Sequence, residues 1–326
     1  MSKTYEQYLR EAGNVHLAYY LEAADILNIK YKVIHKSLMA RFEKDSKHWF
    51  IINTATPLTN TTSTTVAKRK RLTNEVLSMA NIPVPKQKPL LSKQDAITFL
   101  HEHGDIVIKP SQQLGGIGIT LLPKSEKDVT KAYKEAEKHS KSKDKIKVLG
   151  EEFLQGENYR FLVVGDNVVG MVRRKSAHVI GDGVHTIKQL IDSTNIERKR
   201  NILKPIKIDN EVKLRLNNQS LNLKYKPQNG QEIILRYNCN LTTGGTTEEC
   251  SKEVHPFYKG LAINAVKAIG TNFGGVDIIT EDISKPSKCG INEINYNPGL
   301  RLHYKVDKGE AVKVAIPIME YILQTV

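Results

Sequence analysis

Two short apolar segments near the C-terminal end carry side chains that could bind a cation. Asp277 lies at the centre of GVDII (275–279), and Glu293 and Asn295 lie in INEINYNPG (291–299). β-branched residues flank these polar side chains, so both segments are predicted to be short buried strands. Glu293 and Asn295 are two residues apart, and side chains at that spacing on a strand point to the same face.

These three side chains offer oxygen ligands, and no Cys or His accompanies them. Oxygen ligands are typical of Mg²⁺, which is usually bound together with substrate phosphates. A carboxylate inside an apolar strand is costly to bury without a partner. The alternative is two edge strands whose acids face solvent. The motifs that precede these segments in the chain, described below, favour a metal site with Asp277, Glu293 and Asn295 as ligands. Mn²⁺ is an alternative to Mg²⁺.

A lysine-ended strand precedes a glycine-bearing loop in the first half of the chain. Lys109 ends the apolar segment DIVIKP (105–110), and SQQLGGIG (111–118) leads into a returning strand at 119–122. The backbone N–H groups of such a hairpin can fold over phosphates. The loop is neither a Walker loop nor a dinucleotide fingerprint, because it lacks GKS or GKT and no helix follows at once. Gly-rich hairpins are common, so the loop alone is weak evidence.

The composition limits the classes of function. A chain of 326 residues suggests two or three subdomains. The contents of 40% hydrophobic and 26% charged residues are ordinary for a soluble globular protein. No apolar run is long enough to span a membrane, and the first ten residues lack a signal-peptide core. The three cysteines lack CxxC spacing, which favours reduced thiols and a cytoplasmic location.

The net charge of +14 favours an anionic partner. Much of the excess lies in residues 124–147, whose helical spacing and interspersed acids are also typical of a solvated helix face. Aromatic residues make up only 6%, and no nucleic-acid-binding motif is present. We therefore expect a small anionic ligand or acidic peptide rather than nucleic acid, and no membrane partner. The sequence leaves both a monomer and a homo-oligomer as alternatives.

Helix and strand patterns alternate along the rest of the chain. Ser92 is a favourable N-cap, with Asp95 at the capping-box position. Residues 175–235 look polar and irregular, and long insertions in compact folds are usually functional. The expected elements are helices at 17–27, 67–80, 187–192 and 257–269, strands at 31–34, 49–52, 146–154, 159–164 and 168–174, and hydroxyl-rich loops at 60–65 and 242–247.

The order of these motifs resembles the ATP-grasp ligases, and more narrowly the ATP-grasp modules of cyanophycin synthetases and of fused bacterial glutathione synthetases. The resemblance runs from about Ser37 to the C-terminus. It is carried by KRLTNEVLSMANIPVP (70–85), IVIKP (106–110) with GGIGI (115–119), GEEFLQGENYRFLVV (150–164), SAHVIGDGVHTIKQLI (176–191), LRYNCNLTTGGTTEECSKEVHP (235–256), GGVDIITEDI (274–283) and INEINYNPGLRLH (291–303).

This resemblance implies an α/β (α+β) ATP-grasp fold, in which two α+β subdomains grip ATP. It implies a small N-terminal region at 1–66 and an ATP-grasp domain at 67–326. Within that domain, the first lobe would span 67–150 and the second 151–326, with a substrate insertion at 175–250. The implied enzyme is an ATP- and Mg²⁺-dependent ligase: ATP phosphorylates a carboxylate, an amine attacks the acyl phosphate, and an amide, phosphate and ADP result. The expected substrates are amino acids or short peptides.

The resemblance also assigns roles by motif position. Lys70 and Lys109 match the lysines that bind the ATP phosphates, and the flap over them matches Gly115, Gly116 and Gly118. The adenine hinge matches Glu151, Glu152, Phe153 and Leu154, the ribose position matches Asn158, and the Mg²⁺ ligands match Asp277, Glu293 and Asn295. The groups that hold the acceptor carboxylate and the transferring phosphate match Arg160, Arg236 and Asn240, and Arg301 is expected to be a carboxylate fork.

Alternatives remain for residues and for function. Lys70 lies in KRKR and could be a solvated lysine, and Arg160 could be an ordinary strand residue. The chain departs from the family at Arg69, where an acid is usual, and at Asn158, which has Glu157 beside it. A glutathione-synthetase-like ligase and a degenerate ATP-binding regulatory module are the alternative functions. ADP release only when both co-substrates are present separates a ligase from a binding module.

Overall fold

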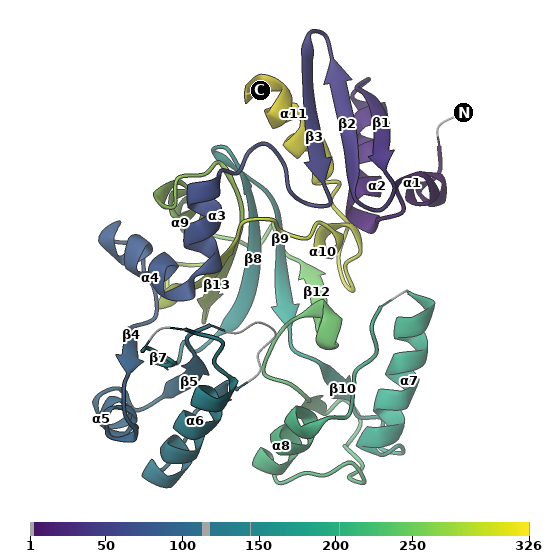
Figure 1. The fold of residues 1–326 in the computed structure, drawn as a ribbon. Helices are drawn as coiled ribbons and strands as arrows, with labels where there is room; N and C mark the ends of the chain where they lie inside the picture. Colours follow the sequence, from purple (N-terminus) through teal and green to yellow (C-terminus); the bar gives the residue numbers. More distant parts are fainter. Residues whose placement is uncertain (1–2, 113–117, 144, 202, 326) are drawn as a thin grey trace.

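The computed structural model describes residues 3–112, 118–143, 145–201 and 203–325, and its N-terminal part packs two helices on a three-stranded antiparallel sheet (Figure 1). Helix α1 begins at a capping box between Thr4 and Gln7 and ends at Gly13, whose φ is 67°. The elements are α1 (Tyr5–Ala12), α2 (Val15–Ile26), β1 (Lys30–His35), β2 (Met39–Lys44) and β3 (Lys47–Ile52).

This N-terminal part does not have a separate core. Its buried helices pack with the C-terminal helix α11 (Ala315–Thr325) and with Leu162, Val164 and Phe273 of the central sheet. Tyr19 stacks on Tyr304, with ring centroids 3.7 Å apart, which joins α2 to the short helix α10 (Arg301–Tyr304). The helices are therefore placed against the segment that follows the predicted metal ligands.

The segment at 60–80 differs from the sequence-based expectation in two ways. The expected loop at 60–65 is wrong, because helix α3 (Thr61–Lys68) begins there. Asn60 caps α3, exchanging hydrogen bonds with Ser63 in a capping box, so the hydroxyl-rich run starts a helix. The expected single helix at 67–80 is interrupted at Arg69, whose φ and ψ are extended, and α4 (Lys70–Met79) follows. Lys70 thereby begins a helix.

A four-stranded antiparallel sheet in the order β4-β7-β5-β6 lies at the lower left of Figure 1. Helices α5 and α6 pack on it through a core that includes Phe99, Ile106 and Val129. Ser92 caps α5 in a box with Asp95, as expected. The elements are β4 (Gln87–Leu90), α5 (Lys93–His103), β5 (Ile106–Pro110), β6 (Thr120–Leu121), α6 (Glu126–His139) and β7 (Val148–Glu152).

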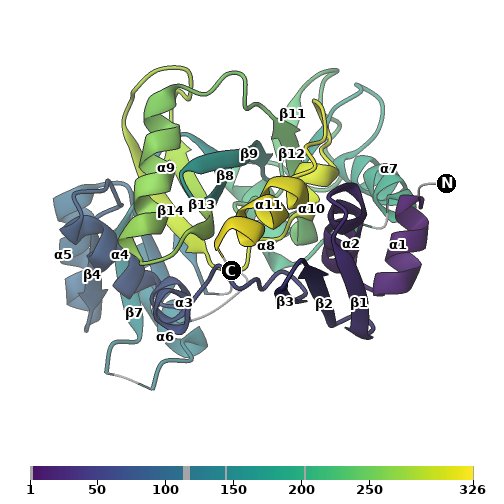
Figure 2. The ribbon, with the colours of Figure 1, turned by 90° about the horizontal axis from the view of Figure 1, so that it is seen from above.

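The central sheet has five antiparallel strands in the order β12-β9-β8-β13-β14. One face is apolar and is covered by helix α9, as Figures 1 and 2 show. Side chains alternate along each strand, so the opposite face carries a second set: apolar Leu162, Val164 and Phe273 under the N-terminal part, and charged side chains further along the same strands. The elements are β8 (Glu157–Val164), β9 (Asn167–Lys175), β12 (Thr246–Glu249), α9 (Pro256–Ala268), β13 (Phe273–Thr280) and β14 (Cys289–Asn295).

The insertion is more regular than the sequence suggested. A two-stranded sheet and two helices enclose a core that includes Val179, Ile191 and Leu216. The expected helix at 187–192 extends to Arg200, and a second helix occupies residues expected to be irregular. The elements are β10 (His178–Ile180), α7 (Ile187–Arg200), α8 (Asn210–Asn218), β11 (Glu232–Ile234) and the 3₁₀ turn η1 (Leu241–Thr243).

The architecture is mixed α and β, as predicted. The proposed limits at 66/67 and 150/151 stay predictions. In the described ranges, no helix has both the length and the apolar character needed to cross a membrane.

We expect the free energy of unfolding to decrease as pH falls from about 6.5 toward 4, partly through two histidines. Burial lowers the pKa of His16 to about 4 and of His303 to about 3, from 6.5. A lowered folded pKa means that the unfolded state binds more protons, so stability is present above pH 6.5 and is lost on acidification. Thermal melting across pH should show a flatter profile for His303→Asn, while the exposed control His101→Asn should follow the wild type.

Candidate active site

The predicted metal ligands share the charged face of the central sheet. Asp277 on β13 is directly opposite Glu293 on β14 and Arg160 on β8. Asn295 lies two residues beyond Glu293 and opposite Gly275, so its side chain belongs to the same face. Antiparallel register therefore brings together side chains from three strands.

Asp277 is 1% exposed, and two arginines bind it. Arg160 donates from Nε to Oδ1 and from Nη2 to Oδ2, the latter at 3.1 Å. Arg174 on β9 donates to Oδ2 at 2.5 Å and to the Asn158 side-chain oxygen at 2.9 Å. Burial favours the neutral acid, but the charges of Arg160 and then Arg174 outweigh it and hold the pKa of Asp277 below its usual value. Asp277 is therefore a carboxylate at neutral pH.

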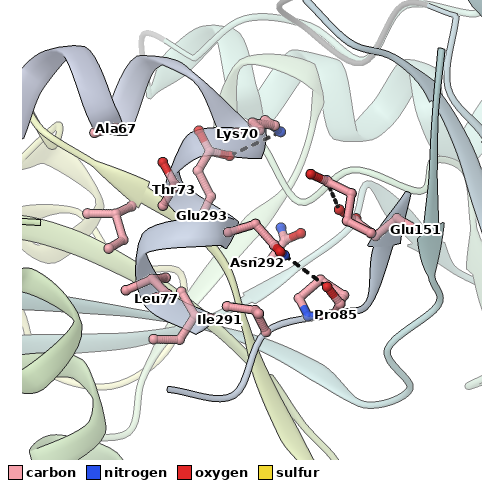
Figure 3. Close-up of a pocket in the computed structure, with 13 residues that line it drawn as sticks. Ala67, Lys70, Thr73, Leu77, Pro85, Glu151, Ile291, Asn292 and Glu293 are labelled. Carbon is pink, nitrogen blue, oxygen red and sulfur yellow. Dashed lines mark hydrogen bonds and ion pairs between the residues drawn. The ribbon is translucent and has the colours of Figure 1, made fainter. Parts of the chain in front are cut away.

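Glu293 and Lys70 both line one pocket and point toward each other, as Figure 3 shows. Their charged atoms are 3.6 Å apart, and the two side chains are 37% and 38% exposed. The Asn295 side-chain nitrogen is buried and has no hydrogen-bond partner among the described residues. Glu293 thus makes a loose, solvent-accessible ion pair that a stronger ligand could displace.

Another wall of this pocket comes from Gln87 of β4 and Glu151 of β7, in the four-stranded sheet. Lys109 on β5 forms a buried ion pair with Glu151 on β7, and Gln87 donates to the same carboxylate oxygen at 2.8 Å. Burial lowers the pKa of Lys109, although the charge of Glu151 opposes this shift. Lys70 and Glu293 are near enough to act electrostatically on Lys109. The pocket therefore lies where the four-stranded sheet meets α4 and β14.

The expected adenine hinge joins the two lobes. The Glu152 carboxylate pairs with Lys288 at 3.2 Å, and the Phe153 N–H donates to the Asp105 carbonyl at 2.9 Å. Leu154 packs over Gly290 of β14, where an added Cβ would lie 2.7 Å from the leucine. Glu151 differs, because its carboxylate faces Lys109. The adenine contacts of Glu151, Glu152, Phe153 and Leu154 stay predictions.

Part of the expected flap is described. Gly118 has a φ of 75°, and an added Cβ would lie 2.9 Å from His139, so glycine suits this position. Gly115 and Gly116 lie outside the described residues. Asn158, expected at the ribose position, lies on the charged face with Arg174. Its neighbour Glu157 points to the other face, where it binds Tyr159 and Arg173.

Three of the expected substrate-binding residues are engaged outside the Asp277 cluster. Arg236 is 4% exposed and binds Asp209 at 2.5 Å as well as Glu211, both near the start of α8. Asn240 caps η1, and its carbonyl accepts from the Thr243 hydroxyl at 3.0 Å. Arg301 donates to the Asn201 carbonyl at 2.8 Å. Arg236 is already neutralised by two carboxylates, so an acceptor carboxylate would have to displace them.

The sequence-based reasoning missed two side chains of the site. Arg174 shares Asp277 with Arg160, and Gln87 shares Glu151 with Lys109. His303 is fully buried, and the charge of Arg160 adds to burial in lowering its pKa. The sequence did contain a signal for Arg174. In the expected hairpin, Val172 lies opposite Arg160, and Arg174 is two residues further along the same strand, so its side chain points to the same face as that of Arg160.

The predicted Mg²⁺ site can be tested against these contacts. Within the described ranges, no three His, Cys, Asp or Glu side chains are grouped to hold a metal by themselves. Glu293 fits an oxygen-ligated ion, because its carboxylate is only loosely paired and is accessible to solvent. The unpartnered atom of Asn295 is its side-chain nitrogen, which is a hydrogen-bond donor, so the role of its oxygen as a metal ligand stays a prediction. Asp277 fits only if its arginines bind another anion, since both of its oxygens are occupied.

Comparison with known proteins identifies the fold. The structure of a bifunctional glutathione synthetase from Pasteurella multocida matches this chain with a TM-score of 0.71 and 26% identity, over 96% of this chain and 44% of that one. The chain has the ATP-grasp fold. The resemblance found in the sequence is thereby confirmed. No protein-family model matches the chain.

Two curated relatives cover most of this ATP-grasp chain. It is 36% identical to the glutathione biosynthesis bifunctional protein GshAB of Clostridium perfringens, over 78% of its own length and 34% of the relative. It is 35% identical to the cyanophycin synthetase of Crocosphaera subtropica, over 77% of its own length and 30% of the relative. The chain therefore spans about a third of the length of these relatives.

Proposed function

We propose that this ATP-grasp chain is an ATP- and Mg²⁺-dependent ligase that joins a carboxylate to an amine through an acyl phosphate. The observation that carries the proposal is one pocket that Lys70, Glu151 and Glu293 line together. Lys109 pairs with Glu151 beside it, and Asp277 is the register partner of Glu293. Relatives named for glutathione biosynthesis and cyanophycin synthesis support an amide-forming reaction.

The charges of the site suit a nucleoside triphosphate. Four cations, Lys70, Lys109, Arg160 and Arg174, face three carboxylates, Glu151, Asp277 and Glu293. The difference of four and three leaves one positive charge at the site, which favours an incoming polyphosphate.

Each group has a distinct part in the proposed reaction. Lys70 and Lys109 bind phosphate oxygens. Arg160 and Arg174 exchange part of their contact with Asp277 for the anion, which frees its carboxylate. Glu293, Asn295 and Asp277 would hold Mg²⁺, which offsets negative charge on the phosphates. The chain's own residues thus orient an in-line transfer and balance its charge.

The proposed acceptor is the carboxylate of an amino acid or short peptide, and the proposed amine is an amino acid. A cyanophycin-synthetase-like reaction is the first choice, and addition of an amino acid to a γ-glutamyl dipeptide is the second. An acidic peptide acceptor fits the net charge of +14. The cytoplasmic location and a homo-oligomeric state stay predictions.

An ADP-release screen over amino acids and short peptides, in acceptor and amine pairs, tests the proposal. For each acceptor that supports turnover, hydroxylamine should replace the amine and yield a hydroxamate, because it captures an acyl phosphate. ADP release that needs no acceptor, or turnover without any hydroxamate, would exclude this reaction. Nucleotide binding without turnover for any pair would favour a regulatory binding module instead.

Lys109→Met is expected to weaken ATP binding by about tenfold or more, because a charged hydrogen bond contributes roughly 1.5–3 kcal/mol. It should also lower the melting temperature, since Glu151 is 7% exposed and keeps only Gln87 as a donor. Adding Glu151→Gln should recover stability but not affinity, as measured by thermal melting and calorimetric titration. Wild-type affinity in Lys109→Met would remove Lys109 from the nucleotide site.

A further inference from the structure

Arg198, near the end of α7, is a buried cation bound by main-chain oxygens. It is 5% exposed and donates from Nε to the Lys204 carbonyl at 2.8 Å. Its Nη2 donates to the Leu241 carbonyl at 2.7 Å, and its Nη1 lies 3.3 and 3.4 Å from the carbonyls of Gly244 and Gly245. Burying a guanidinium is costly, so a set of acceptors this complete indicates a demand for fixed geometry.

Three of the four carbonyls that Arg198 binds, those of Leu241, Gly244 and Gly245, belong to the loop at 238–246. Gly244 has a φ of 111°, and an added Cβ would lie 2.5 Å from Ile206. At Gly245, an added Cβ would lie 2.8 Å from the carbonyls of Cys239 and Lys175. The loop is therefore packed between the insertion core and the end of β9, and Arg198 fixes it from the insertion side.

The loop leads directly to the Asp277 cluster. Thr247, the residue after it, is the register partner of Arg174, which binds Asp277. At the start of the loop, Cys239 contacts Ser176 at 3.4 Å, just beyond the end of β9. Any displacement of the loop would thus be felt beside the candidate phosphate-transfer site.

The same turn of α7 also holds Arg301. The Asn201 carbonyl, three residues after Arg198, accepts from the Arg301 Nη2 at 2.8 Å. Two segments that are far apart in sequence, the loop at 238–246 and the start of α10, are therefore both attached to the C-terminal turn of α7.

We propose that Arg198 is a positioning residue: it fixes the loop at 238–246, to which the sequence resemblance assigns the acceptor carboxylate, relative to Arg301. This inference rests on the proposed ligase function. The amides of Asn240, Thr243, Gly244 and Gly245 donate within the loop, so the groups it could offer a polar substrate are the hydroxyl-bearing side chains of Thr242 and Thr246 and the Asn240 side chain. Nucleotide binding does not depend on this turn, because Lys70 and Lys109 lie on other elements.

The test compares Arg198→Met and Arg198→Lys with Arg200→Met, an exposed arginine on the same helix. Misplacement of substrate-binding groups by about 1 Å can cost 10²-fold in rate, so kcat/KM for the acceptor should fall about 10- to 100-fold in Arg198→Met. The change should appear mainly in the KM of the acceptor, with ADP affinity unchanged. Arg198→Lys should recover part of the loss, and Arg200→Met should match the wild type.

Hydrogen exchange gives a readout that does not need turnover. The amides of Thr243 and Gly245 donate to the Asn240 carbonyl at 3.1 and 3.0 Å, so they should exchange faster in Arg198→Met while the central sheet stays protected. If the wild type proves not to be a ligase, unchanged exchange in Arg198→Met still overturns the positioning role. If it is a ligase, an acceptor KM within twofold of wild type overturns it. Arg198→Lys supplies both measurements if Arg198→Met fails to fold.

Discussion

Glu293→Gln is expected to reduce amide formation by about two to three orders of magnitude or more while leaving the melting temperature nearly unchanged. A catalytic metal contributes several kcal/mol, and about 1.4 kcal/mol corresponds to tenfold in rate. The Glu293 carboxylate is 37% exposed and its pair with Lys70 is loose, so its contribution to folding is small. Glutamine preserves the shape of the side chain and removes the charge.

A matched control separates this effect from a general loss of an ion pair. Glu75 on α4 forms an exposed pair with Arg71 at 3.3 Å, and Glu75→Gln should keep wild-type turnover and stability. The rate of ADP release should be measured across Mg²⁺ concentrations with saturating substrates. A wild-type kcat in Glu293→Gln at high Mg²⁺ would show that Glu293 does not hold the ion. The structure makes this variant a cleaner test than a substitution at Asp277, which is fully buried.

The shared face of Glu293 and Asn295 could be predicted because it depends on local periodicity alone. The strand period of two places them together, and the antiparallel register adds Asp277. The two arginines on Asp277 could not be predicted in the same way. Arg160 is 117 residues away in sequence, and one residue of slippage between β8 and β13 would turn it to the opposite face.

The insertion shows a second limit of sequence reasoning. Residues 175–235 are polar and lack a long apolar stripe, so the pattern suggested an irregular segment. The structure forms α8 there because Asp209 caps it and a few buried side chains, among them Val212 and Leu216, complete a small core. Such a core is assembled from distant segments, so its members are visible only when the strands and helices are placed.

Asp277→Ala is expected to lower the free energy of unfolding by about 3–5 kcal/mol as well as to abolish turnover, because removing one partner of a buried ion pair leaves an uncompensated charge. Arg160 is 6% exposed and would lose both of its hydrogen bonds to the carboxylate. Arg174 would keep its bond to Asn158. Chemical denaturation and ADP release should be measured on the same preparation.

Two further measurements separate the electrostatic origin of this loss from a simple cavity. Adding Arg160→Leu to Asp277→Ala should recover part of the stability without restoring turnover, since it removes one stranded cation. The folded pKa of Asp277 is lowered below its ordinary value of 3.8, so its contribution is present above about pH 4 and is lost as pH falls through the folded pKa. The stability gap between wild type and Asp277→Ala should therefore narrow in strong acid. A gap that is independent of pH, with no recovery in the double variant, would assign the loss to packing and leave the two arginines without a charge-balancing role.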